Sequence, residues 1–478
     1  METLHPGTYL QEVASEQPVE GVSTSIRAFV GLAERGLVGQ SVQINSWKEF
    51  LASYGNYTNN SYLAYAVRGF FENGGTKAVV NRVVHVDEEG NKTSTKATAE
   101  LKAELAGVET VVGIFDAYSD GVWGDKVQVE ISNGSATGTY NITVLEGTSL
   151  VEAYTDVPLE ELDETINLAS TYIKYTAHEE EGFTIAPQTI ALVGGTDGLE
   201  GITTQDYLDG LVAFDQDEIN LISIPGITDK ATVEGIISYV ENRADCSAVL
   251  ATPFGMKPKE AIAYTKQFTS ARINFYYGWL LISDPIGIGK NPVKYVPNDG
   301  HVSGVYARID GSRGVFKAPA GTEAKVQGIL GIEYNVSDEE QDLMNPIGLN
   351  AIRTFEGEGT VIWGARTRSA TPDFRYTQVR RSLDYVGQSL LKSTRWAVFE
   401  SNDSVLWGKI TSIGEAFLSS YWKAGGFKGE SESEAYFFNC NATTVTQDDI
   451  DNGRLFAEVG VAPQKPAEFI IFKLSMLK

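Results

Sequence analysis

Residues 204–224 read TQDYLDGLVAFDQDEINLISI, a helix-like pattern that runs into a short apolar stretch. The same order returns twice further along the chain, as ATVEGIISYVENR (231–243) before SAVLATP (247–253) and as KEAIAYTKQF (259–268) before INFYYGWLLISD (273–284). Helices and strands that alternate at this spacing are typical of a mainly parallel sheet covered by helices. The sequence therefore predicts a middle α/β domain, although the segment 285–345 is rich in Gly and Pro and is expected to be loop-like.

The N-terminal side of this region also mixes helices and strands. SWKEFLASYG (46–55) is predicted to be a helix that is capped by Ser46 and ended by Gly55. KAVVNRVV (77–84) has the continuous apolar character of a buried strand.

The C-terminal side begins with a strongly periodic segment. Residues 376–394 place four apolar side chains at helical spacing, namely Val379, Leu383, Val386 and Leu390. RWAVFES (395–401) is predicted to be a strand, and ITSIGEAFLSSYWKAGG (410–426) a helix that stops at its two glycines.

Charge is spread unevenly along the chain. Residues 85–200 hold 22 acidic residues, five lysines and no arginine, a net charge of −17. Residues 344–478 hold 15 acidic and 15 basic residues. Because KVQVEIS (126–132) and YNITVLEG (140–147) alternate like strands, we predict that 85–200 is an inserted, mainly β domain on the solvated outside.

Composition disfavours several classes of protein. The 478 residues include no run of 18 apolar residues, and the start, METLHPGTYLQEV, has neither the basic nor the apolar part of a signal peptide. The formal net charge of −25 disfavours nucleic acid or an anionic membrane as a partner. We expect a protein made in the cytoplasm, with no nucleic-acid partner and no direct insertion into a membrane.

Motifs for catalysis or cofactor binding are lacking in the sequence. His5, His85, His178 and His301 lie near no nucleophile motif, and Cys246 and Cys440 show no metal-binding spacing. GIGKNP (287–292) contains Gly-Lys, but Asn291 stands where a phosphate-binding loop needs a hydroxyl. We predict no catalytic residue, no metal site and no cofactor. The alternative is a cytoplasmic enzyme or nucleotide-binding protein that uses the α/β region 203–283.

Each end of the chain carries a strand pattern beside an extended linker. Residues 8–13 precede the polar EVASEQPVEGVSTS, and the even positions of EFIIFKLSML (468–477) from Ile470 to Met476 are apolar. Pro463 and Pro466 favour an extended approach to this last strand. Such strands either fold back on their own sheet or add to the sheet of a neighbour, and exchange of the second kind builds rings or helical filaments.

Several segments, taken in order, resemble the contractile tail sheath family. HPGTYLQEV and EGVSTSIRAFVGLAERG resemble the family's N-terminal segment, and GVYARIDGSRGVFKAPAG (304–321) resembles its central motif. The C-terminal part is similar almost end to end, through NPIGLNAIRTFEGEGTVIWGARTRS, RYTQVRRSLDYVGQSLLKSTRWAVFESND, LWGKITSIGEAFLSSYWKAGGFKG and TTVTQDDIDNGRLFAEVGVAPQKPAEFIIF. The resemblance covers residues 5–84 and 300–474, whereas 85–200 resembles no segment of the family.

This resemblance implies a structural protein. Members of the family polymerise as stacked hexameric rings around an inner tube, and they contract to drive that tube through a target membrane. The family serves phage tails, R-type bacteriocins and extracellular injection systems. For this chain the implied partners are copies of itself, the inner tube protein, and baseplate and terminator or cap proteins, assembled in a phage tail or a released extracellular injection particle.

The resemblance also implies a multidomain α+β and α/β architecture with exchanged terminal strand arms. The predicted parts are an N-terminal strand arm and linker (1–24), an inner sheath domain (25–84 plus 344–462), an acidic outer domain (85–200), the middle α/β domain (201–343) and a C-terminal strand arm (463–478). Strand exchange between subunits is assigned to Thr8, Tyr9, Leu10, Glu12, Val13, Glu468, Phe469, Ile470, Ile471, Phe472, Lys473 and Leu474.

The helix at 411–424 is the one that the resemblance places against the inner tube. Its predicted apolar stripe consists of Ile413, Ala416, Phe417 and Tyr421. The polar stripe opposite, assigned to the tube side, consists of Ser412, Glu415, Ser419 and Lys423. The alternative is an ordinary amphipathic helix on the protein surface.

Overall fold

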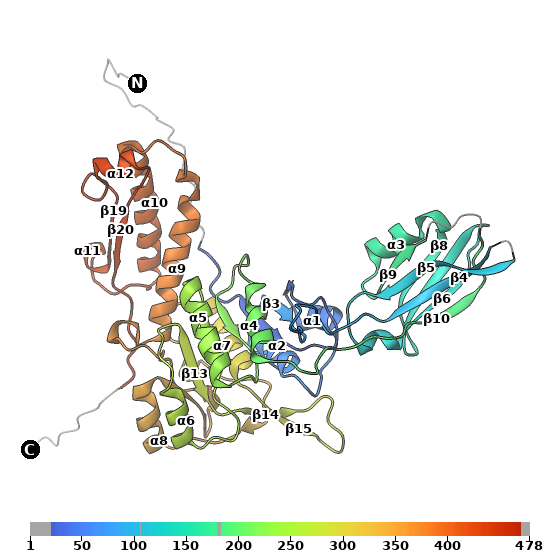
Figure 1. Ribbon diagram of the computed structural model, residues 1–478. Coiled ribbons are helices and arrows are strands. Elements are labelled where there is room, and N and C mark those ends of the chain that lie inside the picture. The colour runs from blue at the N-terminus through green and yellow to red at the C-terminus, as the bar shows by residue number, and fades with distance from the viewer. Residues whose placement is uncertain (1–20, 106, 179–182, 470–478) are drawn as a thin grey trace, which may run out of the picture. The chain divides into compact units, whose positions relative to one another are not determined.

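The computed structural model describes residues 21–105, 107–178 and 183–469 of the chain (Figure 1). It divides the chain into two compact units. The larger unit comprises Thr24–Arg313 and Ala318–Thr377, and the smaller unit comprises Met1–Ser23, Gly314–Lys317 and Gln378–Lys478, as far as these ranges are described. Each unit has a hydrophobic core of its own.

An eight-stranded sheet forms the centre of the larger unit, in the order β18-β17-β13-β12-β11-β1-β3-β2. Neighbouring strands are parallel except at the two ends, where β2 and β18 pair antiparallel. The strands are β1 (Arg27–Gly31), β2 (Ser41–Ile44), β3 (Ala78–Arg82), β11 (Leu221–Ser223), β12 (Ser247–Ala251), β13 (Ile273–Tyr277), β17 (Leu349–Phe355) and β18 (Gly359–Ile362). Every residue of β1, β3, β11, β12 and β13 is buried, because helices cover both faces.

Alternate side chains of these strands point to opposite faces of the sheet. Ala28 and Ile222 belong to the core under α4 (Thr204–Val212), α5 (Lys230–Arg243), α6 (Pro258–Thr265) and α8 (Asp338–Met344). Phe29 and Leu221 belong to the cores formed with α1 (Trp47–Tyr54), α2 (Leu63–Glu72) and α7 (Asp299–Arg313). The predicted α/β alternation is therefore confirmed, and so is the first helix, which Ser46 caps and Gly55 ends.

Helices α2 and α7 approach each other through glycines. A Cβ atom at Gly300 would stand 2.2 Å from the Ala66 carbonyl oxygen, and one at Gly304 would stand 2.4 Å from that of Phe70. His301 is fully buried at this contact, and burial lowers the pKa of its imidazole to about 4. The expected loop at 285–345 is thus wrong, since it contains α7. This helix is buried around most of its circumference and shows no amphipathic period by which the sequence could reveal it.

Residues 85–200 form a mainly antiparallel β body with its own core around Trp123 and Phe115. One sheet contains β4 (Thr98–Leu105), β5 (Val108–Ala117) and β9 (Ile173–Ala177). The other contains β6 (Val127–Asn133), β7 (Thr139–Glu146), β8 (Ser149–Pro158) and β10 (Gln188–Ala191), and α3 (Leu162–Ala169) lies beside β9. Among the described residues of this body, Asp120 is the one buried acidic side chain, so the excess of carboxylates faces solvent.

The base of this β body contacts the rest of the larger unit through buried polar groups. The Arg82 guanidinium donates to the carbonyl oxygens of Gly36, at 3.1 Å, and Asp120, at 2.7 Å. The Asp120 carboxylate in turn accepts from Lys92 and from Ser94, both at 2.6 Å. A third small sheet of the larger unit consists of β14 (Leu280–Ser283), β15 (Val293–Val296) and β16 (Gly331–Ile332).

The predicted grouping of 25–84 with 344–462 needs correction. Strand β1 pairs with β11 on one side and with β3 on the other, so 25–84 shares a sheet with the middle α/β region. Residues 349–362 close that same sheet through β17 and β18, and the smaller unit takes only the chain from Gln378 onward together with two short segments. Parallel strands pair across long sequence separations, and the local pattern does not encode their order.

The smaller unit is built from two long helices and a hairpin-like ribbon. Its elements are α9 (Thr377–Thr394), α10 (Ser404–Lys423), α11 (Glu432–Ala435), β19 (Tyr436–Asn439), α12 (Gln447–Asp451) and β20 (Glu458–Val461). The two long helices are confirmed predictions. The strand expected at 395–401 is wrong: one 3-10 turn (Arg395–Ala397) follows α9, and Phe399 has a left-handed backbone with φ of 71°.

Candidate functional site

A two-stranded antiparallel ribbon of β19 and β20 lies on the smaller unit. Its register pairs Tyr436 with Val461 and Asn439 with Glu458. Within the described part of the chain, no other strand pairs with the outer edge of either β19 or β20. The backbone N–H and C=O groups on both edges are therefore available to added strands.

Strand β19 is seated directly on α10. Phe438 of β19 is buried, and a Cβ atom at Gly414 of α10 would stand only 2.4 Å from its ring. The core below consists of Val386 from α9 with Leu406, Ile410, Phe417, Leu418 and Tyr421 from α10. The ribbon is thus held along its β19 side by close packing on a helix.

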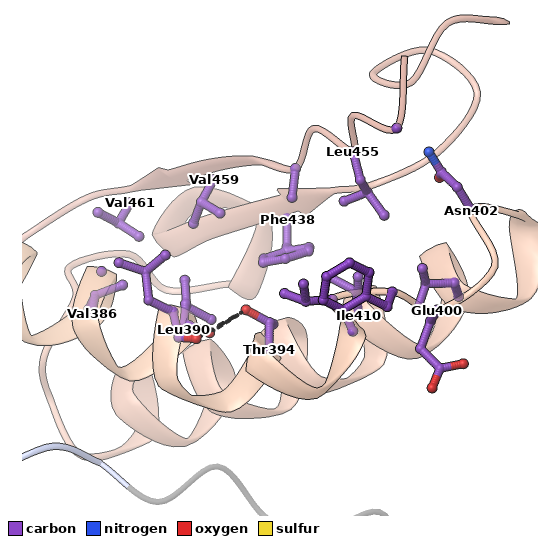
Figure 2. A pocket seen from close by; sticks show the side chains of 18 of the residues that line it. Val386, Leu390, Thr394, Glu400, Asn402, Ile410, Phe438, Leu455, Val459 and Val461 are labelled. Carbon is purple, nitrogen blue, oxygen red and sulfur yellow. Dashed lines mark hydrogen bonds between the residues drawn. The ribbon is translucent and has the colours of Figure 1, made fainter. Parts of the chain in front are cut away.

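An apolar groove runs between the ribbon and the two long helices (Figure 2). Its volume is about 950 Å³, and its lining includes Val386, Leu390, Ile410, Phe438, Val459 and Val461. Figure 2 shows Val459 and Val461 of β20 facing Val386 and Leu390 of α9 across the open space, while Glu400 and Asn402 stand at the other end. A groove of this kind leaves apolar surface in water, which is characteristic of a binding surface.

Large apolar side chains are exposed around this groove. Leu391, Val398 and Val459 are each at least one-third exposed, and Phe399 is completely exposed. Residues 397–399 fall within the strand predicted at 395–401, so the sequence did not predict this groove. The signal was the apolar run AVF directly after a complete amphipathic helix, where no further core position was needed.

The first residues inward of the two terminal arms are both hydrogen-bonded to the smaller unit. The Val22 amide donates to Ser389 Oγ of α9 at 3.3 Å, so the described N-terminal segment starts beside α9. At the other end, Pro463 pairs with Phe427, and the Gln464 side-chain Nε2 donates to the Phe427 carbonyl oxygen at 3.1 Å. The C-terminal arm, predicted to begin at 463, is therefore held in place at least as far as Gln464.

Most residues assigned to strand exchange lie outside the described residues. These are Thr8, Tyr9, Leu10, Glu12, Val13, Ile470, Ile471, Phe472, Lys473 and Leu474. Glu468 and Phe469 are described, do not form a strand in the single chain, and leave the Phe469 ring largely exposed.

The polar stripe that was assigned to the tube side lies on α10. Ser412, Glu415 and Lys423 are exposed, while Ser419 is half-buried and donates to Glu432 Oε1 at 2.9 Å. The predicted apolar stripe is only partly right, because Phe417 and Tyr421 are buried but Ala416 is exposed. The buried face instead runs along Leu406, Ile410, Gly414, Phe417, Leu418 and Tyr421.

Two family models match adjacent parts of the chain. The phage tail sheath protein central domain matches residues 200–368, and the phage tail sheath C-terminal domain matches residues 369–476. Together they cover more than half of the 478 residues. The chain belongs to the contractile tail sheath family. The first match includes the whole of 203–283, so the alternative of an enzyme using that region is not supported.

Curated tail sheath proteins are similar over part of the chain. The tail sheath protein of Vibrio phage KVP40 is 25% identical over 181 residues, which are 37% of this chain and 26% of that protein. A prophage major tail sheath protein of Pseudomonas aeruginosa is 26% identical over 218 residues, which are 44% of this chain and 54% of that protein. The chain thus spans between about a quarter and about half of the length of these sheath relatives.

Solved sheath structures share the fold over nearly the whole chain. The sheath tail protein of Listeria innocua has a TM-score of 0.66 at 15% identity, covering 92% of this chain and 96% of that one. The sheath complex of an extracellular contractile injection system, in its contracted state, has a TM-score of 0.60 at 23% identity, covering 99% and 98%. The mixed α/β fold with several sheets is therefore that of sheath proteins. None of the helices in the described part of the chain has the length and hydropathy of a membrane span.

Proposed function

We propose that this chain is the structural subunit of a contractile sheath. Copies polymerise as stacked hexameric rings around an inner tube, and contraction of the lattice drives that tube through a target membrane. Baseplate proteins and terminator or cap proteins lie at the ends of the assembly. The observation that supports this proposal best is the β19–β20 ribbon, whose two edges are unpaired in the described chain.

Strand exchange is the mechanism of assembly in this proposal. The segments 8–13 and 468–474 of neighbouring copies add to the free edges of the ribbon and produce a four-stranded sheet. Main-chain hydrogen bonds supply affinity in such β-augmentation, and side chains on alternating faces supply specificity. Because donor and acceptor surfaces differ, the contact does not close as a dimer and propagates along a helical lattice.

Charge distribution supports an arrangement with the acidic β body outward. That body has a net charge of −17, and its described carboxylates other than Asp120 are at least partly exposed. A shell of such bodies on the outside keeps like charges apart and keeps the particle soluble. The smaller unit, from the balanced C-terminal third, suits the crowded inner shell, with the Ser412, Glu415, Ser419 and Lys423 stripe of α10 toward the tube.

In this proposal the contracted lattice has more contacts between subunits than the extended lattice. A gain of about 400 Å² of apolar contact per copy, at about 25 cal/mol per Å², corresponds to about 10 kcal/mol gross. The extended lattice is then a kinetically trapped state, and the arms keep the copies connected while their bodies rotate. After β20 the arm must bend beyond Gln464, since Ala462 and Gln464 are hydrogen-bonded to the smaller unit.

Negative-stain electron microscopy of the purified full-length chain tests the proposal. We expect long hollow helical tubes whose rings have six subunits. Discrete compact particles at all concentrations and salt conditions would contradict the proposal.

A further inference from the structure

Two arginines of the large sheet are completely buried, and only one of them has hydrogen-bond partners in the described chain. Arg82 at the end of β3 donates to the carbonyl oxygens of Gly36 and Asp120. Arg27 at the start of β1 is 0% exposed, and its Nε, Nη1 and Nη2 atoms have no hydrogen-bond acceptor among the described residues. A guanidinium carries five N–H donors, and buried donors in proteins are almost always paired. Arg27 therefore needs acceptors other than these residues.

The ion-pair partner of Arg27 is Asp299, the first residue of α7. Asp299 Oδ2 lies 3.8 Å from Arg27 Nη2, which is too far for a direct hydrogen bond, and it accepts from Ser223 Oγ of β11. The other carboxylate oxygen, Oδ1, is buried without a hydrogen bond in the described chain. Both groups of the pair thus keep unsatisfied polar atoms, although neither side chain is more than 2% exposed.

Burial disfavours the charge of both groups. It lowers the pKa of the Arg27 guanidinium to about 10 and raises the pKa of the Asp299 carboxyl, in spite of the attraction between the two. The guanidinium carbon lies 5.0 Å from the centre of the Phe29 ring, and this contact stabilises the cation through its face but leaves the N–H donors at its edge unpaired. The chain thus replaces only part of the solvation that the pair loses on folding.

We propose that Arg27 and Asp299 bind internal water, which bridges the guanidinium N–H groups to the carboxylate, and that this hydrated ion pair fixes the register of β1 in the sheet. A buried water makes about three hydrogen bonds, so about two molecules satisfy the unpaired nitrogens of Arg27 together with Asp299 Oδ1. Water fits better than an anion, because Asp299 already balances the charge of Arg27. The proposal concerns the fold of the single chain and is independent of the proposed sheath function.

The pair lies at the seam between two apolar clusters. Parallel pairing sets Arg27 beside Leu221 and Phe29 beside Ser223, so these four side chains point to the same face of the sheet. Phe29 and Leu221 belong to different clusters of buried apolar residues on that face. Arg27, Ser223 and Asp299 therefore stand together between the clusters, and water bound there contacts polar atoms, as internal water in proteins does.

Apolar patterning alone does not set the register of β1. Every residue of β1 and of its neighbours β3 and β11 is buried, so these strands have no polar face by which one register differs from the next. A shift of β1 by one residue turns Arg27 to the opposite face of the sheet, away from Asp299. Burial of a charge without its partner is strongly unfavourable, so the pair selects one register.

Two measurements on the unmodified full-length chain test the bound water. A density map that shows ordered water should contain peaks at hydrogen-bond distance from Arg27 Nε and Nη1. X-ray footprinting, in which hydroxyl radicals form from bound water, should oxidise Phe29 several-fold faster than Phe115 in the core of the β body, although both rings are 0% exposed. Direct bonds from all the Arg27 nitrogens to protein oxygens, a halide peak that bromide replaces, or equal oxidation of the two rings would overturn the water site.

Two variants test the role of the pair in the register. Arg27→Met leaves Asp299 buried without a cation and should lower the melting temperature of the larger unit. Addition of Asp299→Asn removes that charge and should recover most of the loss, because a buried ion pair replaced as a unit is often close to neutral. Amide hydrogen exchange of 27–31 in the double variant should be about ten-fold faster than in the wild type, with 273–277 of β13 unchanged as the control. No recovery by the second substitution, or unchanged exchange in 27–31, would overturn this role.

Discussion

The eight-stranded sheet of the larger unit and the β19–β20 ribbon of the smaller unit differ in how completely a single chain buries their strands. The large sheet ends in antiparallel strands β2 and β18, has helices over both faces, and buries every residue of β1, β3, β11, β12 and β13. The ribbon has two strands, two unpaired edges in the described chain, and an apolar groove of about 950 Å³ beside it. The large sheet is buried within a single chain. The ribbon instead has the form of an acceptor for strands of other subunits.

Deletion of residues 466–478 should produce the largest contrast between the two regions. We expect the truncated chain to remain folded, with an unchanged melting temperature of the larger unit, but to form no tubes, because the ribbon loses its incoming strand. Circular dichroism with thermal melting and electron microscopy measure the two effects. An unfolded product would mean that this segment completes its own core, and strand exchange would lose its main support.

A glycine substitution in α7 should lower the stability of the larger unit alone. Gly304→Ala places a Cβ atom 2.4 Å from the Phe70 carbonyl oxygen, and we expect a loss of about 2 kcal/mol in the free energy of unfolding. Gly311→Ala on the same helix is the matched control, because no atom lies within 4 Å of its Cβ, and it should be neutral or stabilising by up to about 1 kcal/mol. Urea unfolding measures both. Equal effects of the two substitutions would contradict the close contact of α2 and α7.

Acidification should lower the free energy of unfolding of the larger unit, because His301 is buried there. Burial holds the pKa of this imidazole at about 4, below its ordinary value of 6.5, so between these values the unfolded chain binds a proton that the folded chain excludes. Stability that is fully present above pH 6.5 is therefore lost as the pH falls, at about 1.4 kcal/mol per pH unit.

The comparison of wild type with His301→Gln sharpens this prediction. From pH 7 to pH 5 the wild type should lose about 2 kcal/mol more than the variant in urea unfolding. Parallel pH profiles of the two proteins would show that His301 is solvated in the folded state.

Removal of the acidic β body should have the smallest effect on assembly. Thr95 and Thr196 lie side by side, with the Thr95 amide 3.2 Å from the Thr196 carbonyl oxygen, so two glycines can replace residues 96–195. We expect a folded chain, about 1–3 kcal/mol less stable because Arg82 and Lys92 lose Asp120 as a partner, that still forms tubes. A folded variant without tubes would place the β body among the lattice contacts.

Local sequence signals were sufficient for most elements of this fold. The helix–strand alternation of 204–284 predicted β11, β12 and β13 with their helices, and the apolar spacing of Val379, Leu383, Val386 and Leu390 predicted α9. The acidic composition of 85–200 predicted that this segment forms a separate body, and it has a core of its own. The sequence did not predict helix α7, because a helix that is buried on most sides has no amphipathic period. The strand predicted at 395–401 is wrong because Val398 and Phe399 are apolar but do not belong to the core.

The sequence by itself determined the family, the kinds of element, the uneven charge and the apolar alternation of the chain's last residues. Tertiary structure alone decided that β1 lies between β11 and β3, which moves 25–84 out of the predicted inner domain, and that α9, α10 and β20 enclose a groove. The physical reason is that periodicity records which face of an element is apolar. It does not record which distant element covers that face, since the pairing of strands and the seating of a ribbon on a helix depend on contacts far apart in the chain.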